Sequence, residues 1–449
     1  MLLGQTPPSL EKLSVDTVDY WIIWTPTDLI WLADPDTTLL DADSDGTDDF
    51  ESLAAKMDGN YRLGTDIIFD ADPAFVDWNN DGTVGVGADT LGLYAIGGDG
   101  APRFTGHFDG RNYAIENVYK SNTASLWQRI AMFGSVEGCT IENLYVKNVH
   151  FRNNEDYGGI IAARATYGGH NVFRRIYVDG VYDHRFKTSG SLHCGGIVGR
   201  LDHGEVTECV SMMTGLGVRS RFGGLVGTLE DSAFIKNSYS VSTFSGLEKM
   251  GLVVGVVDGN EYTAIENCYA AGTLTAATDP PDSEIGSFGG NIGGGTVPVS
   301  SYWDADLYPT GVGDGDSAAI VAVTGLTTVE FSSMTSFEGW DFDNIWAMGT
   351  VDGTNRPYLR WLDEGPIVGI PEKENAKSSM IKVYPNPATS VLTIDNAPVN
   401  AEYRMMNIIG QVVESGIISG NKVMLNLDNY QKGIYLLVIG EEVSKVMVE

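Results

Sequence analysis

The chain has 449 residues, including 55 glycines, and its 28 lysines and arginines are outnumbered by 60 aspartates and glutamates, giving a net charge of −32. An excess of negative charge disfavours nucleic acids and anionic membrane surfaces as partners, and it favours divalent cations and an extracellular setting. Since the sequence contains no run of 18 apolar residues, no segment is predicted to span a bilayer.

Residues 1–15 are expected to be the remnant of an export signal or disordered, because the apolar start is too short and uncharged for a complete signal peptide. Residues 16–103 predict a small mixed α/β module. Thr25 is placed to cap a helix that begins at Pro26, and a second helical patch at 50–57 precedes a strand at 60–67. Such a module would cover the open end of a repeat array.

Two acidic loops interrupt this cap, and both are spaced like the start of a Ca²⁺ loop. The stronger candidate ligands are Asp41, Asp43, Asp45 and Asp48. The weaker set is Asp77, Asn79 and Asp81. Because Ser52 stands where an EF-hand has glutamate, the first loop is not an EF-hand. Structural Ca²⁺ is the expected cofactor, and solvated acidic turns are the alternative in both loops.

A five-residue phrase recurs about every 30 residues through the middle of the chain. Its copies, typified by Ile-Glu-Asn-x-Tyr, lie at 115–119, 141–145, 235–239 and 265–269. A second phrase, Gly-Gly-Ile/Leu-x-Gly/Ala, alternates with it at 158–162, 195–199 and 223–227, with a degenerate copy at 251–255. Short β-branched runs broken by glycine and asparagine indicate strands and tight turns, so the repeat predicts a parallel β-helix rather than a helical solenoid.

In this parallel (right-handed) β-helix, equivalent residues of successive coils would stack on one another. The asparagine is interpreted as a corner residue, because asparagine tolerates left-handed backbone angles and stacked amides can bond to each other. The closing tyrosines would then point outward and could stack on sugar rings or a partner; in the alternative reading, they line the core. The candidate ligand-binding residues are Tyr145, Tyr177, Tyr239 and Tyr269.

The segment Phe104-Thr-Gly-His-Phe-Asp-Gly110, the segment 132–136 and the Gly-Gly phrases together resemble the bacterial GLUG-motif β-helix proteins. The resemblance implies a secreted or surface protein of adhesin-like character. The β-helix is assigned to residues 104–362, with its end near the aromatic segments 337–343 and 356–361.

A polar segment at 363–379 predicts a linker, and alternating strands at 380–449 predict a small β-sandwich. This last part resembles the C-terminal sorting domain of type IX secretion substrates. The residues that carry the resemblance are Tyr384, Pro385, Asn386, Pro387, Gly433 and Tyr435. It implies the type IX secretion machinery as a partner, followed by removal of the domain and release or attachment to surface lipopolysaccharide.

The complete fold class is therefore all-β, with a mixed α/β cap, a β-helix and a C-terminal sandwich. We expect a binding or adhesion protein on the outer surface of a Gram-negative bacterium or in its surroundings, with a carbohydrate or cell-surface ligand. The acids and histidines at Asp179, Asp183, His184 and Asp202–His203 show no recurring pair spacing, so no catalytic role is predicted. A carbohydrate-active β-helix enzyme (polysaccharide lyase or hydrolase) and a structural surface-layer spacer are the alternatives.

Overall fold

The chain divides into two compact units, residues 1–369 and 370–449, within the segment predicted as a linker. None of the described helices is long and apolar enough to cross a membrane. The computed structural model describes residues 10–15, 17–34, 40–42, 48–70, 76, 92–98, 102–121, 129–152, 156–166, 168–184, 192–218, 220–260, 262–277, 284–366, 382–384, 388–395, 401–407, 412–418, 420, 422–427, 430, 432–439 and 442–448.

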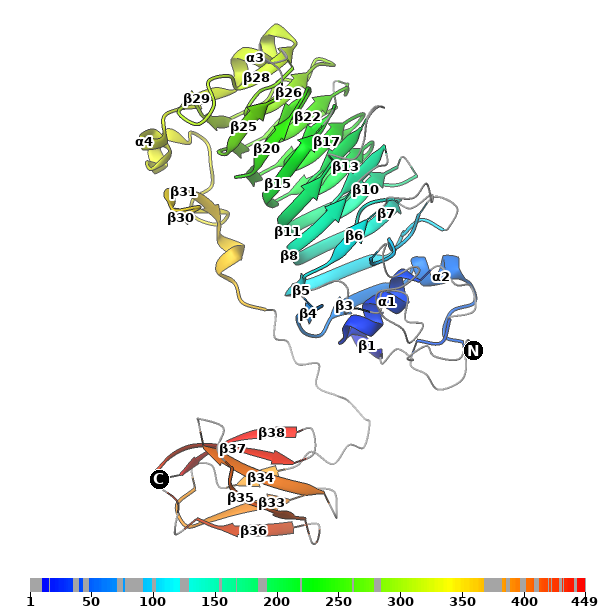
Figure 1. Ribbon diagram of the computed structural model, residues 1–449, viewed down its shortest axis with the longest axis vertical. Helices are drawn as coiled ribbons and strands as arrows, with labels where there is room; N and C mark the ends of the chain where they lie inside the picture. The colour runs from blue at the N-terminus through cyan, green and yellow to red at the C-terminus, as the bar shows by residue number, and fades with distance from the viewer. Residues whose placement is uncertain are drawn as a thin grey trace. The chain divides into compact units, whose positions relative to one another are not determined.

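The first unit is a parallel β-solenoid whose short strands stack in rows from coil to coil (Figure 1). The largest sheet contains β1 (Glu11–Val15), β2 (Val18–Ile23), β3 (Asn60–Leu63), β4 (Ile67–Ile68), β5 (His107–Glu116), β6 (Tyr119–Ser121), β8 (Thr140–Arg152), β11 (Asn171–Asp183), β14 (Gly204–Thr207), β15 (Val210–Val218), β18 (Ala233–Lys236), β19 (Tyr239–Ser240), β20 (Thr243–Gly246), β23 (Ala264–Glu266), β24 (Tyr269–Ala270), β25 (Thr273–Ala276), β27 (Tyr302–Asp304) and β29 (Thr324–Leu326).

Two further parallel sheets complete the coils. One contains β7 (Phe133–Val136), β10 (Ala162–Ala165), β13 (Val198–Leu201), β17 (Val226–Leu229), β22 (Val254–Val257), β26 (Gly289–Ile292) and β28 (Val312–Gly315). The other contains β9 (Tyr157–Gly159), β12 (His193–Gly195), β16 (Phe222–Gly223) and β21 (Met250–Gly251). The predicted β-helix architecture is confirmed.

The first position of the repeat forms a buried column inside the solenoid. Successive register partners are Ile141, Phe173, Val206, Ile235 and Ile265, all fully buried. The copy at 115–119 does not belong to this column. Ile115 pairs with Ile67 and Val146, and Phe108 instead lies beside Ile141. The prediction that equivalent residues of the four copies stack on one another is therefore wrong for the copy at 115–119.

The repeat asparagines do form corners with left-handed backbone. Asn143, Asn237 and Asn267 have φ of 52°, 47° and 52°. Asn267 Nδ2 donates to Asn237 Oδ1 at 3.1 Å, so the stacked amides bond to each other. Where the asparagine is replaced, Arg175 and Glu208 keep φ at 52° and form an ion pair of 3.0 Å. In the two coils that lack the asparagine, this ion pair thus replaces the hydrogen bond between stacked asparagine amides.

The Gly-Gly phrase serves a second corner where backbone segments approach closely. A Cβ at Gly195 would lie 2.2 Å from the carbonyl oxygen of Val198, and one at Gly223 would lie 1.8 Å from that of Val226. Real Cβ atoms do not approach oxygen so closely, so only glycine fits these positions without backbone movement.

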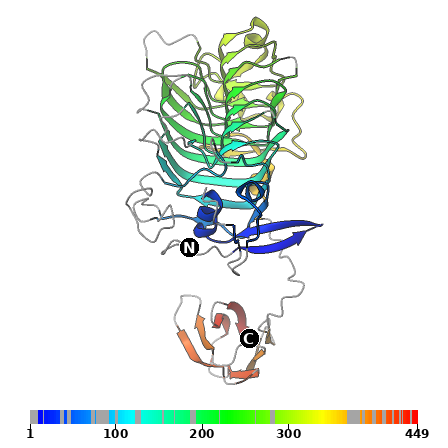
Figure 2. The ribbon, with the colours of Figure 1, turned by 90° about the vertical axis from the view of Figure 1, so that its right-hand side faces the viewer.

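The N-terminal cap lies across one end of the solenoid (Figure 2). Its helices are α1 (Pro26–Ala33) and α2 (Leu53–Met57), and Thr25 and Asp28 form a capping box on α1. Leu29 and Leu32 of α1 pack into the core of the first coils. The cap also includes β1, which pairs with β2, so residues 11–15 form a strand and the expectation of disorder is wrong for them.

One lysine is buried in the first coils. Lys120 of β6 lies beside Phe151, is 1% exposed, and its Nζ donates to the carbonyl oxygen of Ala131 at 3.3 Å. Burial lowers the pKa of this amine from 10.5 to about 7.

After the last coils the chain turns back along the solenoid. We call residues 327–366 the strap; it contains α4 (Thr328–Phe331), η3 (Met334–Ser336), β30 (Trp346–Val351), β31 (Thr354–Leu359) and η4 (Arg360–Asp363), and it follows α3 (Ser317–Ala322) and β29. Its contacts reach progressively earlier coils: Trp340 Nε1 donates to Ser300 O, Trp361 Nε1 to Glu208 O, and Gly365 O accepts from Asn112 Nδ2. Residues 363–365, predicted as linker, are therefore part of the strap.

The second unit consists of two antiparallel sheets that share one hydrophobic core, as predicted for a sandwich. The sheets are β32 (Lys382–Tyr384), β33 (Val391–Asp395) and β36 (Lys422–Asn426), and β34 (Glu402–Asn407), β35 (Val412–Ile417), β37 (Gly433–Ile439) and β38 (Glu442–Val448). Tyr435 lies in the core, whereas Tyr384 is exposed. Pro385, Asn386 and Pro387 lie outside the described residues.

Candidate functional site: a pocket between the strap and the tyrosine column

The closing tyrosines form a column on the outer wall of the solenoid. We call this set, in register from coil to coil, the tyrosine column: Tyr145, Tyr177, Val210, Tyr239, Tyr269 and Tyr302. The preceding residues, such as Leu144 and Ile176, belong to the inner core, whereas the column belongs to a separate cluster with the strap. The column therefore faces out of the solenoid but is partly covered.

The strap seals the later part of the column. The rings of Tyr239 and Tyr269 stack at 4.8 Å with an interplanar angle of 5°, and both are buried. Trp346 packs against both rings, and the Tyr269 hydroxyl donates to the carbonyl oxygen of Pro357 at 2.7 Å. The ring of Tyr269 is thus unavailable to a ligand, and Tyr239 contributes only to a pocket floor.

The earlier part of the column is more open. Tyr145 and Tyr177 are half-buried, with ring centroids 5.7 Å apart. Trp361 packs on Tyr145 at 5.2 Å, and burial, reinforced by the charges of Glu364 and Asp363, raises the pKa of Tyr145 to about 12. The strap touches Tyr145 but leaves a cavity beside Tyr177.

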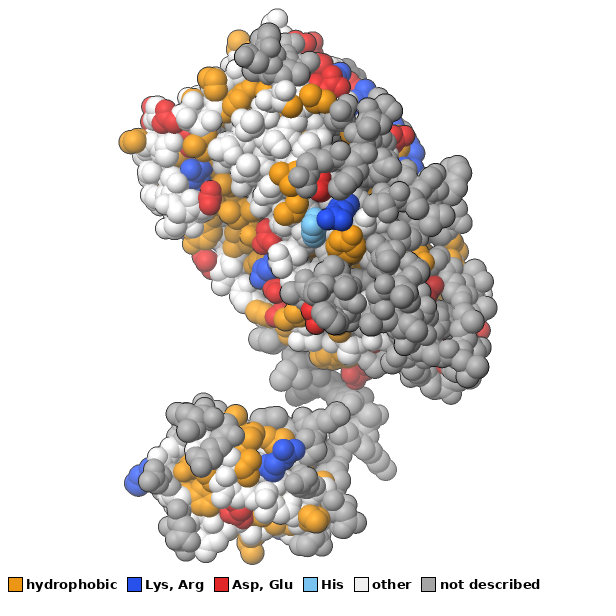
Figure 3. Space-filling view, viewed as in Figure 1, with side chains coloured by type: hydrophobic (Ala, Val, Ile, Leu, Met, Phe, Trp, Pro, Cys, Tyr) orange, Lys and Arg blue, Asp and Glu red, His pale blue; other side chains and the backbone are white. Residues whose placement is uncertain are grey.

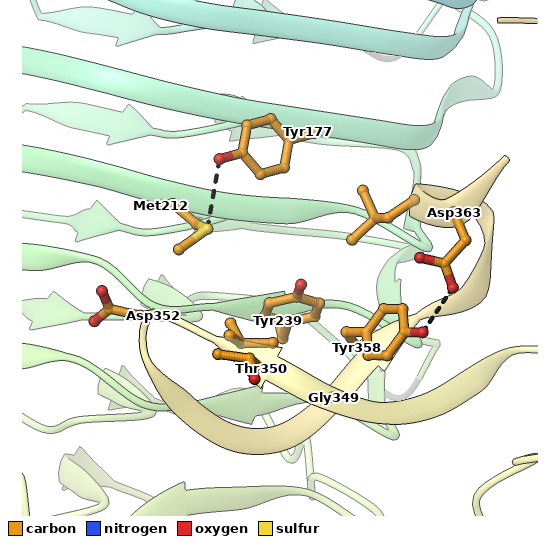
Figure 4. A pocket seen from close by; sticks show the side chains of 10 residues that line it. Tyr177, Met212, Tyr239, Gly349, Thr350, Asp352, Tyr358 and Asp363 are labelled. Carbon is orange, nitrogen blue, oxygen red and sulfur yellow. Dashed lines mark hydrogen bonds between the residues drawn. The ribbon is translucent and has the colours of Figure 1, made fainter. Parts of the chain in front are cut away.

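This cavity has a volume of about 410 Å³. It is lined by Tyr177, Met212, Tyr239, Gly349, Thr350, Val351, Asp352, Tyr358, Leu362 and Asp363. Figure 4 shows Tyr177 and Met212 on the solenoid wall, with the β30–β31 hairpin opposite and Asp352 and Asp363 at opposite ends. On the face drawn in Figure 3, hydrophobic side chains gather where the hairpin meets the solenoid.

Hydrogen bonds within the pocket engage two of its three phenols. The Tyr358 hydroxyl donates to Asp363 Oδ2 at 2.6 Å, and the Tyr177 hydroxyl donates to Met212 Sδ at 3.5 Å. The bond to Asp363 raises the pKa of Tyr358, and burial, with help from the charge of Asp179, raises the pKa of Tyr177. Both phenols are therefore neutral across the physiological range and act as apolar walls with a polar edge.

The hairpin geometry sets the position of Asp352. Val351 pairs with Thr354, so Asp352 and Gly353 make a two-residue turn with φ of 47° and 72°. Asp-Gly is the preferred sequence for this kind of turn. The turn leaves Asp352 exposed at the rim, while Val351 is buried on the pocket side.

The predicted Ca²⁺ residues are only partly described. Asp41 and Asp48 lie in the cap, whereas Asp43, Asp45, Asp77, Asn79 and Asp81 lie outside the described residues. The neighbouring Asp49 closes the first loop, since its Oδ2 accepts the Ala42 amide at 2.8 Å. Within the described part of the chain, no group of three metal-ligating side chains is brought together. Ca²⁺ binding stays a prediction.

The acids weighed for catalysis are engaged in separate interactions. Asp202 is buried and pairs with Arg200 at 2.6 Å, and Arg200 also pairs with Glu230 at 2.6 Å. Asp179 accepts the Asn148 amide at 2.6 Å, on a different wall of the solenoid. Burial raises the pKa of Glu230, while Arg200 opposes that shift. The arginine between these carboxylates makes their arrangement an ion-pair network.

Sequence reasoning missed the strap's share of the site. The sequence pattern predicts no role for Tyr358, Asp352 or Asp363, and it indicates only that the solenoid ends near the aromatic segments of the strap. The signal available in the sequence was the concentration of tryptophan in that segment, at Trp340, Trp346 and Trp361.

Comparisons with known proteins give a family match for the C-terminal residues and several relatives that match part of the chain. Residues 382–449 match the family model of the secretion system C-terminal sorting domain. The chain is 29% identical over 185 residues to the Immunoglobulin A1 protease of Streptococcus pneumoniae strain R6, which covers 38% of this chain and 8% of that protein. It is 26% identical over 189 residues to the Immunoglobulin A1 protease of Streptococcus sanguinis, covering 34% of this chain and 10% of that protein.

A "Putative Gly-rich membrane protein" of Evansella cellulosilytica is 31% identical over 121 residues, covering 26% of this chain and 13% of that protein. The chain thus spans about a tenth of the length of these curated relatives. A solved structure of IgA1 Protease is similar at 17% identity with a TM-score of 0.36, covering 62% of this chain and 19% of that one. The matched tail implies secretion by the type IX machinery, so this chain is a secreted or cell-surface β-solenoid that carries a secretion-system sorting domain.

Proposed function

We propose that the protein is an adhesion or binding protein of the bacterial surface, and that the pocket beside Tyr177 is its ligand site. The observation that carries the proposal is the cavity of about 410 Å³ built jointly by the solenoid wall and the strap. Concave sites of this size, with apolar walls and a few polar groups, are the usual form of ligand sites.

The architecture supports binding in two ways. Stacked coils give a rigid wall, so the pocket is held in shape before the ligand arrives and little conformational entropy is lost on binding. The strap is anchored by Trp346 and Trp361, both buried, on either side of the pocket. A pre-formed site on an exported protein suits capture of a partner outside the cell.

The sorting domain adds a processing step after export to the proposal. After export, removal of residues 380–449 and attachment to lipopolysaccharide or release would present the solenoid outside the outer membrane of a Gram-negative bacterium. Structural Ca²⁺ at the acidic loops of the cap would lower the repulsion within a chain of net charge −32. The likeness to GLUG-motif proteins agrees with a surface role.

The names of the relatives favour a second candidate. Two of them are called Immunoglobulin A1 protease, so the solenoid could serve as an accessory module of proteolysis or carry an activity itself. Incubation of the full chain with immunoglobulin A1 and with acidic and neutral polysaccharides tests this directly. Release of fragments would replace the binding conclusion with an enzymatic one.

The binding proposal is tested with the full chain on intact cells and on glycan and protein arrays, with Ca²⁺ and with a chelator. Tyr177→Ala removes a pocket wall and should weaken binding about tenfold. Tyr262→Ala is the matched control, because Tyr262 is 70% exposed and does not line the pocket. If both variants bind like the wild type, the pocket is not the site, and absence of any binding partner would favour the spacer role.

A further inference from the structure

We propose that the pocket beside Tyr177 takes a cationic side chain, a lysine ammonium or an arginine guanidinium, from a basic segment of a partner polypeptide. The inference rests on the proposed function and specifies the chemistry of the ligand.

The first argument is charge. The ten lining residues include two carboxylates, Asp352 and Asp363, and no lysine, arginine or histidine. Arg360, which follows β31 in η4, is exposed and directs its Nη2 to the carbonyl oxygen of Phe342. Arg175 is paired with Glu208 at 3.0 Å and with Glu364 at 3.5 Å. An anionic ligand would therefore meet uncompensated carboxylates, whereas a cation would meet a partner at either end.

The second argument comes from the neighbouring coil. Lys147 stands two residues after Tyr145, and its Nζ lies 5.1 Å from the centroid of the Tyr145 ring. The equivalent position after Tyr177 is Asp179, and on the next coil it is Met212. The Tyr145 ring thus has a cation, Lys147, beside it, whereas the residue at the same offset from Tyr177 is an acid, Asp179. A cation from outside would restore at Tyr177 the arrangement that Lys147 provides at Tyr145.

The third argument is the balance of hydrogen-bond donors and acceptors. The hydroxyls of Tyr177 and Tyr358 donate to Met212 and Asp363, so their protons are already used. Tyr239 and Thr350 also line the pocket and add two hydroxyl donors, but these are outnumbered by the acceptor oxygens of the phenols and of the two carboxylates. A sugar hydroxyl needs donors as well as acceptors, whereas an ammonium or guanidinium group only donates. The pocket therefore matches a donor-only ligand better than a neutral sugar.

The placement of the acids points to a polypeptide as the source of the cation. Asp352 and Asp363 lie at opposite ends of the pocket, one at the hairpin turn and one in η4 (Figure 4). One basic side chain can enter between the tyrosine rings and pair with one carboxylate, while a second basic residue of the same segment pairs with the other. A cavity of about 410 Å³ leaves room for the aliphatic stem beside Met212 and Leu362.

The test measures binding of fluorescent tetra-arginine and tetra-lysine peptides to the full chain at low salt by anisotropy. Tetra-glutamate, an uncharged chitooligosaccharide and phosphatidylcholine vesicles are the comparison probes. The Asp352→Asn/Asp363→Asn double variant should bind the basic peptides about tenfold more weakly, and Tyr177→Ala about fivefold. Asp343→Asn is the matched control, because Asp343 is an exposed acid of the strap that does not line the pocket. It should change binding less than twofold.

Weakening of peptide binding by the pocket variants but not by the control supports the proposal. Equal binding by wild type and double variant, or preference for the oligosaccharide, overturns it. Binding of the vesicles alone would assign the cation to a lipid headgroup and overturn the polypeptide source. If the basic peptides do not bind while Tyr177→Ala still abolishes adhesion to cells, the proposal of a cationic ligand is refuted and the proposed binding function is kept. If Tyr177→Ala affects neither, the proposed function itself falls.

Discussion

Replacement of the buried Lys120 by methionine should make the protein more stable, and increasingly so at lower pH. Lys120 is 1% exposed, and its Nζ donates a hydrogen bond to the carbonyl oxygen of Ala131. Burial disfavours the ammonium form, which lowers the pKa in the folded state to about 7 from 10.5 in the unfolded chain. Methionine has a similar length and no charge, so Lys120→Met removes the ionisation without opening a large cavity.

The magnitude follows from the two pKa values. Between pH 10.5 and 7 the unfolded chain binds more protons than the folded one, so the stability of the wild type rises with pH across this window. The proton-linked penalty is about 5 kcal/mol at pH 6, about 3 kcal/mol at pH 8 and about 1 kcal/mol at pH 10. Loss of the hydrogen bond to Ala131 costs the variant about 1 kcal/mol at every pH.

The assay is urea unfolding of wild type and Lys120→Met, followed by tryptophan fluorescence at pH 6, 8 and 10. The variant should be more stable by about 4 kcal/mol at pH 6 and about equal at pH 10. Since other groups titrate alike in both proteins, the difference between them isolates Lys120. Parallel pH profiles, or a variant that is less stable at pH 6, would refute the reasoning.

Three further outcomes are expected. Trp346→Ala, at a fully buried strap position, should cost about 3–5 kcal/mol and expose the strap to limited proteolysis, whereas Val329→Ala, 80% exposed, should change stability by less than about 0.5 kcal/mol. Asn267→Ala should lower stability by about 1–2 kcal/mol in urea unfolding, because φ is 52°, and Asn267→Gly should cost less; equal losses would argue against backbone strain. Hydrogen bonding to His107, with support from Arg174, lowers the pKa of Glu142 from 4.5 to about 2, so its stabilisation is complete above pH 4.5 and is lost as pH falls through 2. Acid titrations of Glu142→Gln should show a shallower loss than the wild type, and identical acid transitions would contradict this.

The repeat pattern was sufficient to predict the solenoid because stacking is a local rule applied many times. The column from Ile141 to Ile265 and the left-handed corners at Asn237 and Asn267 follow from residue type alone. The first copy departs from the predicted register because two similar asparagine corners, at Asn143 and Asn148, follow each other on β8. Asn117 aligns with Asn148, whose Nδ2 donates to it at 2.7 Å, so the copy at 115–119 belongs to the corner at Asn148 and not to the corner at Asn143.

The site could not be predicted in the same way. The outward direction of the tyrosines follows from the corner, but the strap that covers them lies far along the chain. Tyr269 bonds to Pro357, 88 residues away, and Tyr145 bonds to Leu362, 217 residues away. No periodicity links these segments. Trp346 packs against Tyr239 through a tertiary contact. The pocket lies next to this contact, where the strap no longer packs directly on the column.

Site-specific photocrosslinking from the pocket rim tests the central claim most directly. With p-benzoylphenylalanine in place of Thr350, the full chain incubated with its target cells should form one discrete crosslinked product, and excess basic peptide should suppress it. The same photoreactive residue in place of Val321, which is 80% exposed on α3 outside the pocket, should form none. Equal crosslinking from both positions, or crosslinking from Val321 alone, would contradict binding at the pocket between the strap and the tyrosine column.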